Sequence, residues 1–345
     1  MTTFGATLAR ALAAGAAICT LTGGCAFGHP TMTSRSADPA APYQLIQEPD
    51  DGYEPILNLI RSARHSVQMT MYQLSDPDAV DALVDARRRG LDVKVILDAA
   101  YHGQTVNTDA YGQLRDAGVD VIWAPNDVIY HQKSVTVDDT TSAVGTGNLT
   151  ARYYATSRDA YVVTTNPADV AAISATFTTD FTSPPAGRPP EATPSPRLVW
   201  SPDARAVFLQ RITSATQTLD ITSEELKDRA IVAAIDQSAR RGVACRIVLT
   251  ENPAWARSVA EVSAAGCSVH LMPDTPTGLY MHEKILLTDD NLIIGSHNLS
   301  TTSLLENREL SLQLDTTTAP DIIAAVRATF DRDYRQAPPA QSSTR

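Results

Sequence analysis

The stretch Leu279–Leu310 reads LYMHEKILLTDDNLIIGSHNLSTTSLLENREL and carries the pattern around which the chain is organised. His282 and Lys284 stand two residues apart in a run rich in β-forming residues. Residues i and i+2 of a strand point to the same face, so the imidazole and the ammonium are expected to project together. Asp289 follows, and then the turn Gly295–Asn298, whose small residues allow the backbone to approach a ligand closely. This stretch therefore predicts one wall of a binding site.

The same pattern occurs a second time, earlier in the chain. His131, Lys133 and Asp138 repeat the spacing H-x-K-x4-D, and the segment Gly145–Asn148 reads GTGN where the later turn reads GSHN. The chain contains only four lysines, and two of them belong to these patterns. Outside the motifs, ARRRGLDVKVILD at 86–98 matches SARRGVACRIVLT at 238–250. Such regular similarity indicates an internal duplication.

The intervening sequence predicts a fold of the α/β class. From residue 43 onward, short apolar runs alternate with helical patterns, which is typical of strands connected by helices. We expect two tandem α/β/α sandwich repeats at 43–182 and 197–335, related by a pseudo-twofold axis that brings both motifs to one cleft. The segment 183–196 contains six prolines and is expected to be an exposed linker. The tail 336–345 is expected to be disordered.

The paired motifs resemble those of the phospholipase D superfamily, and the resemblance covers about residues 43–335. Members of this superfamily are phosphodiesterases in which two H-x-K-x4-D halves surround one active site. The resemblance implies that one motif histidine attacks phosphorus and forms a phosphohistidine. The other histidine protonates the leaving oxygen and then activates water or an alcohol. Symmetry alone leaves open which histidine attacks, and the resemblance favours His131 as nucleophile and His282 as acid.

Both motifs together supply the expected catalytic residues, which are His131, Lys133, Asp138, His282, Lys284 and Asp289. The two lysines, with the amides of Asn148 and Asn298, are expected to bind the non-bridging phosphate oxygens. Their positive charge and hydrogen bonds offset the negative charge that hinders attack on a phosphodiester. Within this set the two aspartates are expected to brace the strand turns, and they need not touch the substrate.

The resemblance also implies a carboxylate that holds the far nitrogen of each histidine, placed after the asparagine turn. Asp159 and Glu309 lie 28 and 27 residues after the histidine of their own half and are the predicted orienting residues. The alternative is that both are surface carboxylates at strand starts. No further His, Cys and Asp cluster has the spacing of a metal site. We therefore expect an enzyme without a metal or another cofactor.

The N-terminal residues 1–25 resemble a secretory signal. Arg10 precedes the apolar run ALAAGAAICTLT, which is too short to span a bilayer. The end, LTGGC, resembles a lipobox in which Cys25 becomes lipidated, although Thr22 stands where leucine is usual. Ordinary cleavage nearby or an uncleaved anchor are the alternatives. Residues 26–42 are expected to be a flexible tether, so we expect an outward-facing membrane lipoprotein or a secreted protein.

Export would decide whether the remaining cysteines lie in an oxidising compartment. Cys245 and Cys267 each begin a predicted strand in consecutive βαβ units, and such strands usually lie side by side. A disulfide between them is expected in an oxidising compartment. Two buried free thiols are the equally open alternative.

The charge of the chain bears on its substrate. The formal net charge is −11, whereas proteins that hold long nucleic acids usually have a basic face. We therefore expect a monomeric phospholipase D-type phosphodiesterase that hydrolyses or transphosphatidylates phospholipid headgroups at a membrane surface. The alternatives are a metal-independent endonuclease of the same superfamily, a cardiolipin-synthase-like phosphatidyltransferase, and a silent binding protein that kept the fold.

Overall fold

The computed structural model describes residues 41–182 and 187–340, and all of these residues belong to one compact unit. The predicted signal sequence, Cys25 and nearly all of the predicted tether lie outside the described residues, as do the last five residues of the predicted tail. Among the helices of the described ranges, none combines the length and the apolar character that a membrane span requires.

The secondary-structure elements form two sets. In the first half they are β1 (Tyr43–Glu48), α1 (Glu54–Arg61), β2 (Ser66–Met71), α2 (Pro77–Arg88), β3 (Asp92–Leu97), α3 (Gly103–Asp116), β4 (Asp120–Trp123), β5 (Lys133–Val137), β6 (Thr141–Gly145), the short 3-10 helix η1 (Ala151–Tyr153), β7 (Ser157–Thr164) and α4 (Pro167–Thr182). In the second half they are β8 (Leu198–Ser201), α5 (Arg205–Ser214), β9 (Thr218–Thr222), α6 (Arg229–Arg240), β10 (Ala244–Thr250), η2 (Pro253–Trp255), α7 (Ala256–Ala264), β11 (Ser268–Met272), β12 (Tyr280–Met281), β13 (Ile285–Thr288), β14 (Asn291–Gly295), α8 (Thr301–Leu305), β15 (Glu309–Asp315) and α9 (Pro320–Gln336).

The two sheets have the same strand order. The first runs β1-β7-β6-β5-β2-β3-β4, and the second runs β8-β15-β14-β13-β9-β10-β11. In each of these orders the strands at one end are parallel, β2-β3-β4 and β9-β10-β11, and the other neighbours are antiparallel. Every strand except β12 therefore has a counterpart in the other half. The expected pair of tandem α/β repeats is confirmed.

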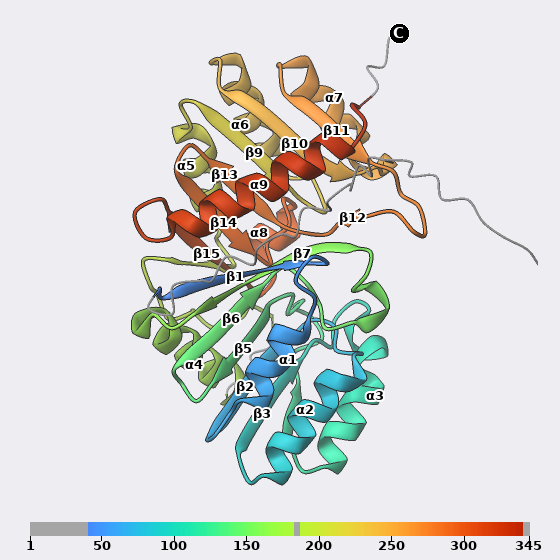
Figure 1. Cartoon of the computed structure of the whole chain (residues 1–345), viewed down its shortest axis with the longest axis vertical. Helices are drawn as coiled ribbons and strands as arrows, with labels where there is room; N and C mark the ends of the chain where they lie inside the picture. Colours follow the sequence, from blue (N-terminus) through green and yellow to red (C-terminus); the bar gives the residue numbers. More distant parts are fainter. Residues whose placement is uncertain (1–40, 183–186, 341–345) are drawn as a thin grey trace, which may run out of the picture. The chain divides into compact units, whose positions relative to one another are not determined.

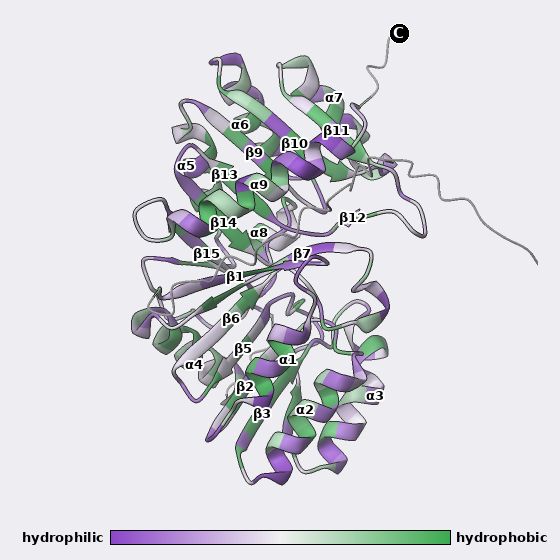
Figure 2. Cartoon of the chain, in the orientation of Figure 1, coloured by the Kyte–Doolittle hydropathy of each residue, from purple (hydrophilic) through white to green (hydrophobic). Residues whose placement is uncertain are grey.

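Each sheet is covered by helices on both faces. In β10, Ile247 and Leu249 pack into the core that α5, α6 and α7 share, whereas Val248 packs against Phe330 of α9. Side chains alternate between the two faces of a strand, so α9 must cover the face opposite α5–α7. Figure 1 shows α9 crossing the front of this sheet. In Figure 2, hydrophilic and hydrophobic stripes alternate on α1 and α2, as expected for helices with one buried face.

The two halves exchange short pairings beside the motif histidines. β12 belongs to the second half, yet it pairs in parallel with β7 of the first half and places Met281 opposite Arg158. In the opposite sense, Tyr130 of the first half forms an isolated β-bridge with Arg308 of the second half. The residue directly before each motif histidine therefore lies against the other half. This reciprocal arrangement is the pseudo-twofold relation that the duplication predicts.

The two arginines in these pairings also form buried ion pairs across the halves. Arg158 donates to Asp333 of α9 at 2.7 and 3.0 Å, and Arg308 donates to Asp180 of α4 at 2.6 Å. All four side chains are at most 3% exposed. A buried charge that loses its partner is strongly destabilising, so each pair ties the halves together.

We expect Asp180→Ala to lower the free energy of unfolding by about 3–5 kcal/mol, because Arg308 would remain buried without its carboxylate. Urea denaturation followed by circular dichroism measures this loss. Asp85→Ala is the matched control, since Asp85 pairs with Arg88 on the exposed surface of the first half. There we expect a change of about 1 kcal/mol or less. Equal effects of the two substitutions would show that the buried pair does not stabilise the protein.

A disulfide joins Cys245 and Cys267. β10 and β11 are neighbouring parallel strands whose register places Arg246 opposite Ser268. The two cysteines directly precede these residues, so their side chains meet at the start of the strand pair. In this structure the cysteines form a bridge and are not free thiols.

Candidate active site

The two motifs lie at corresponding places in the two halves. Lys133 is the first residue of β5, and Lys284 directly precedes β13. His131 and His282 stand two residues earlier, in the segments that pair with the opposite half. The fold therefore brings both motifs to the boundary between the halves.

Each motif histidine is held by a carboxylate of the other half. His131 Nδ1 lies 2.9 Å from a carboxylate oxygen of Glu309, and His282 Nδ1 lies 2.7 Å from a carboxylate oxygen of Asp159. The spacing along the chain had suggested that each carboxylate serves the histidine of its own half, and that assignment is wrong. Asp159 and Glu309 do meet the histidines, but with the partners exchanged.

The exchange follows from the pairings between the halves. Arg158 lies opposite Met281, so the next residues along the two parallel segments, Asp159 and His282, come together. The same reasoning applies to Glu309 and His131, which follow the bridged pair Arg308 and Tyr130. Neither histidine could be oriented in this way by one half alone.

Further hydrogen bonds fix the two carboxylates. Asp159 accepts from Thr146 Oγ1 and Ser157 Oγ, each at 2.6 Å. Glu309 accepts from Ser303 Oγ at 2.6 Å and from Asn307 Nδ2 at 3.0 Å. A methyl group at Gly147 would lie 2.9 Å from the Asp159 carboxyl carbon, so glycine is needed there to leave room for this side chain.

Both carboxylates are ionised at neutral pH. Burial acts to raise the pKa of Glu309, but the adjacent His131 outweighs burial and the pKa falls to about 2. Burial likewise acts to raise the pKa of Asp159, and His282 with its hydrogen bond holds it below the ordinary value. An ionised carboxylate at Nδ1 fixes the proton on that nitrogen, which leaves Nε2 of each ring for chemistry.

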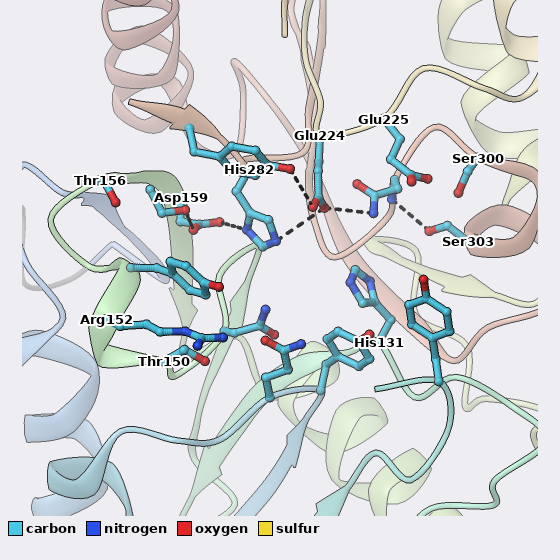
Figure 3. A pocket seen from close by; sticks show the side chains of 18 of the residues that line it. His131, Thr150, Arg152, Thr156, Asp159, Glu224, Glu225, His282, Ser300 and Ser303 are labelled. Atoms are coloured by element: carbon cyan, nitrogen blue, oxygen red, sulfur yellow. Dashed lines mark hydrogen bonds and ion pairs between the residues drawn. The ribbon is translucent and has the colours of Figure 1, made fainter. Parts of the chain in front are cut away.

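The two histidines line one cavity of about 810 Å³ between the halves. Figure 3 shows both rings pointing into it from opposite sides, with Asp159 behind His282. Asn148 and Asn298, the predicted phosphate-binding amides, also line this cavity. The structure thus brings the four residues together, and a phosphodiester in the cavity would face an imidazole and an amide from each half.

The motif lysines lie just behind the cavity wall. Lys133 is fully buried, and its Nζ donates to the carbonyl oxygen of His131 at 2.5 Å. Lys284 makes the same bond to the carbonyl of His282 and lies 3.0 Å from a carboxylate oxygen of Glu224. Their charges act on the cavity at close range in a poorly solvated setting, where electrostatic interactions are strong.

The motif aspartates do not line the cavity, so within the predicted catalytic set they have the bracing role and no contact with a substrate. Asp138 accepts hydrogen bonds from the backbone N–H groups of residues 64–66, at 2.7–3.1 Å. Asp289 accepts likewise from the N–H groups of residues 216–218, at 2.8–2.9 Å. These donors precede or begin β2 and β9, where backbone groups need partners. The geometry matches the predicted bracing of the strand turn.

Two buried groups are expected to govern the pH dependence of a reaction in this cavity. Burial holds the pKa of His131 below 6.5, although Glu309 opposes this shift, so the neutral imidazole that the predicted nucleophile requires persists in mildly acidic solution. Burial lowers the pKa of Lys133 to about 7, so its positive charge is lost as the pH rises through that value. We expect kcat/KM to decline above about pH 7 and to have its acid limb below pH 6.5.

Lys133→Arg tests this assignment, because arginine keeps its charge to high pH. The alkaline limb of kcat/KM should then move upward by about two units or more. Lys94→Arg is the matched control, because Lys94 is a partly exposed lysine of β3 in the same half that pairs with Asp92, and it should leave the profile unchanged. An alkaline limb that stays near pH 7 in Lys133→Arg would assign it to another group.

Two residues of the cavity, Tyr72 and Glu224, escaped the sequence analysis. Tyr72 directly follows β2, and Glu224 lies just beyond β9. The two residues correspond in the duplication, because Leu74 and Leu226, two residues after each of them, make equivalent β-bridges. The Tyr72 ring centroid lies 4.7 Å from that of His131. Glu224 contacts His282 and Lys284. Aligning the ends of these two strands would have revealed both, since parallel strands of such sheets end at the site.

Residues 41–182 and 187–340 contain no group of three or more His, Cys, Asp and Glu side chains arranged to hold a metal ion. The carboxylates of Asp159, Glu224 and Glu309 are already engaged by histidine, lysine and hydroxyl groups.

The family described as "Cardiolipin synthase, PLD-like domain" matches the chain twice, at residues 56–181 and 208–334. Cardiolipin synthase A of Pseudomonas fluorescens strain SBW25 is 28% identical over 310 residues, which cover 78% of this chain and 64% of that protein. Cardiolipin synthase A of Cronobacter sakazakii is 24% identical, over 79% of this chain and 65% of that protein. The chain therefore spans just under two thirds of each of these relatives.

Solved structures show the same fold at lower identity. The phosphatidylserine synthase of Haemophilus influenzae aligns with a TM-score of 0.68 and 14% identity, covering 87% of each chain. The polyphosphate kinase of Porphyromonas gingivalis aligns with a TM-score of 0.64 and 15% identity, over 84% of this chain and 47% of that one. At these identities the likeness establishes the fold.

Proposed function

This chain belongs to the phospholipase D superfamily through two copies of the PLD-like domain, and it is an enzyme that acts on phosphodiesters; on that premise we propose that it is a phosphatidyltransferase. In this proposal it transfers a phosphatidyl group from a phospholipid to an alcohol. The observation that carries the proposal is the pair of histidines facing each other across one cavity, each with Nδ1 on a carboxylate. This is the arrangement that two successive displacements at phosphorus require.

The first displacement begins with neutral His131. Its Nε2 forms a bond to phosphorus while the bond from phosphorus to the headgroup oxygen breaks. His282 gives the proton of its Nε2 to that oxygen, and the headgroup leaves as an alcohol. The carboxylate of Glu309 stabilises the positive charge that develops on the His131 ring.

The second displacement reverses these roles. His282, now neutral, takes the proton of an incoming alcohol, whose oxygen bonds to phosphorus as the bond to His131 breaks. Lys284 and the amides of Asn148 and Asn298 bind the phosphate oxygens during both displacements in this proposal. Water can replace the alcohol, and the product is then phosphatidic acid.

Transfer is preferred to hydrolysis because the matching family and the relatives with 24–28% identity are described as cardiolipin synthases. The word synthase in these names supports transfer to an alcohol as the second step of the proposal. The cavity of about 810 Å³ has room for more than the reacting phosphate. Hydrolysis remains the competing second step of the same mechanism.

The mouth of the cavity supports a lipid substrate. Tyr101 and Tyr153 are the large hydrophobic side chains that stand out as exposed among the described residues, at 78% and 48%. Both line the cavity, as does Arg152, whose guanidinium lies 4.6 Å from the Tyr153 ring centroid. Tyrosine and arginine suit the boundary between lipid and water, so we propose that this rim contacts the membrane surface.

The proposed function is tested by incubating the purified protein with vesicles of phosphatidylglycerol and phosphatidylethanolamine and added ethanol. Mass spectrometry of the lipids should detect phosphatidylethanol and cardiolipin in excess over phosphatidic acid. Phosphatidic acid as the sole product, with ethanol in excess, would identify a hydrolase. Cleavage of single-stranded DNA at physiological salt without turnover of any lipid would identify the nuclease.

A further inference from the structure

Glu224 occupies the position that a substrate phosphate is expected to take. One of its carboxylate oxygens lies 3.0 Å from Lys284 Nζ, 3.2 Å from Asn298 Nδ2 and 3.4 Å from His282 Nε2. Its other oxygen accepts from the Tyr280 hydroxyl at 3.3 Å. Figure 3 shows the carboxylate of Glu224 between His282 and the side chains on the far wall of the cavity. Three groups assigned to the phosphate and its leaving oxygen are thus already engaged by an anion.

Phosphate and Glu224 must compete for these groups. The single proton on His282 Nε2 cannot serve both the carboxylate and the leaving oxygen. Burial acts to raise the pKa of Glu224, but Lys284 and His282 outweigh burial and hold it well below its ordinary value. The carboxylate is therefore charged at neutral pH, and a bound phosphate must displace it as an anion.

The first half has no such carboxylate at the corresponding place. Tyr72 stands there, and its ring centroid lies 5.0 Å from Lys133 Nζ. Of these two equivalent positions, only the one beside the proposed acid His282 therefore holds a carboxylate. This is the side from which the headgroup departs in the proposed mechanism.

A displaced Glu224 remains in the cavity, since its side chain is only 23% exposed. A charged carboxylate that loses its partners in a poorly solvated place is costly. An ammonium on the departing headgroup would offset that cost, because the phosphate takes Lys284 and the carboxylate takes the ammonium. A glycerol headgroup carries no charge and leaves the carboxylate unpaired.

We propose that Glu224 is the headgroup-recognition residue of this enzyme and selects phospholipids whose headgroup carries an amine, such as phosphatidylethanolamine, as the phosphatidyl donor. The inference rests on the proposed function and names the substrate class of the first displacement. Tyr280 positions the carboxylate through its hydroxyl group.

The experiment compares kcat/KM for phosphatidylethanolamine and phosphatidylglycerol as donors, presented separately in the same neutral detergent micelles. The wild-type protein should favour the amine-bearing donor by about 10-fold or more, which corresponds to the loss of about one charge-assisted hydrogen bond. In Glu224→Gln the two values should come within about threefold of each other. Glu225→Gln is the matched control, because Glu225 lines the same cavity but pairs with Lys227. It should keep the wild-type ratio.

A second measurement uses no lipid. Inorganic phosphate is titrated into each protein and followed by ³¹P NMR, and Glu224→Gln should bind it about 10-fold more tightly than the wild-type protein. An unchanged donor ratio or an unchanged phosphate affinity in Glu224→Gln would overturn the inference. If no variant turns over any phospholipid, the proposed function fails separately. The phosphate titration alone then decides whether Glu224 competes for the anion site.

Discussion

His131→Ala and His282→Ala are each expected to lower kcat/KM by about 10⁴-fold or more, because each displacement at phosphorus needs both imidazoles. The two rings line one cavity from opposite halves, so neither half retains a working site on its own. Initial rates of phosphatidylethanol formation measure the loss. The double variant should be little worse than either single variant, since the two residues act as a unit.

His65→Ala is the control for these substitutions, because His65 is exposed and lies outside the cavity. It should retain wild-type activity. A single motif variant that keeps more than about a tenth of the wild-type rate would rule out a shared site. Loss of a general acid–base or nucleophilic residue lowers the rate far more than that. The circular dichroism spectra of all variants should match, because neither histidine belongs to a hydrophobic core.

Glu309→Gln is expected to lower kcat/KM by about 10²–10⁴-fold, because glutamine does not fix the proton of His131 on Nδ1. Asp159→Asn should have an effect of similar size through His282. Because Glu309 contacts His131 of the other half, its substitution should also affect one imidazole ring and not the other. Glu309→Gln should change the ¹⁵N shifts of the His131 ring and leave those of His282 unchanged.

Glu306→Gln provides a neighbouring control, since Glu306 is exposed and precedes Glu309 by three residues. Its activity and its histidine spectra should be those of the wild-type protein. A response of His282 in place of His131 to Glu309→Gln would mean that each carboxylate serves its own half.

Much of the fold follows from the sequence because the duplication repeats its signals. The strand pattern of Thr218–Thr222 agrees with β9 at both ends, and Gly90 and Gly242 mark the ends of α2 and α6 at φ near +90°, a conformation that glycine adopts easily. In contrast, the sequence does not mark where α3 begins, at Gly103. Its first turns contain Thr and Asn, which form helices weakly in isolation.

The first turns of α3 depend on contacts that no local pattern contains. The buried Asn107 accepts from the backbone N–H of Leu74 and donates to the carbonyl oxygens of Tyr72 and Asp98. These bonds join α3 to the ends of β2 and β3, and they exist only once the sheet has formed. Tertiary contacts here outweigh the weak local preference.

The residues of the site divide in the same way, into those that local sequence patterns reveal and those that depend on tertiary contacts. The spacing of the motifs found both histidines, both lysines and both asparagines, because these residues are fixed by strand periodicity and tight turns within one half. The exchange of Asp159 and Glu309 between the halves arises from pairings between segments far apart in the chain. Glu224 belongs to neither motif, and its role depends on its distance from Lys284 and His282. Such relations are set by packing between the halves, which spacing does not reveal.

The central claim is that a phosphatidyl group passes through a covalent bond to His131 in a site that both halves build. His282→Ala removes the group that activates the incoming alcohol, so with a donor bearing a good leaving group this variant should accumulate the intermediate. Mass spectrometry of peptides from protein quenched at alkaline pH, where phosphohistidine survives, should find the phosphatidyl adduct on His131. An adduct on His282 in His131→Ala alone, or no adduct in either variant during continued turnover, would contradict the claim.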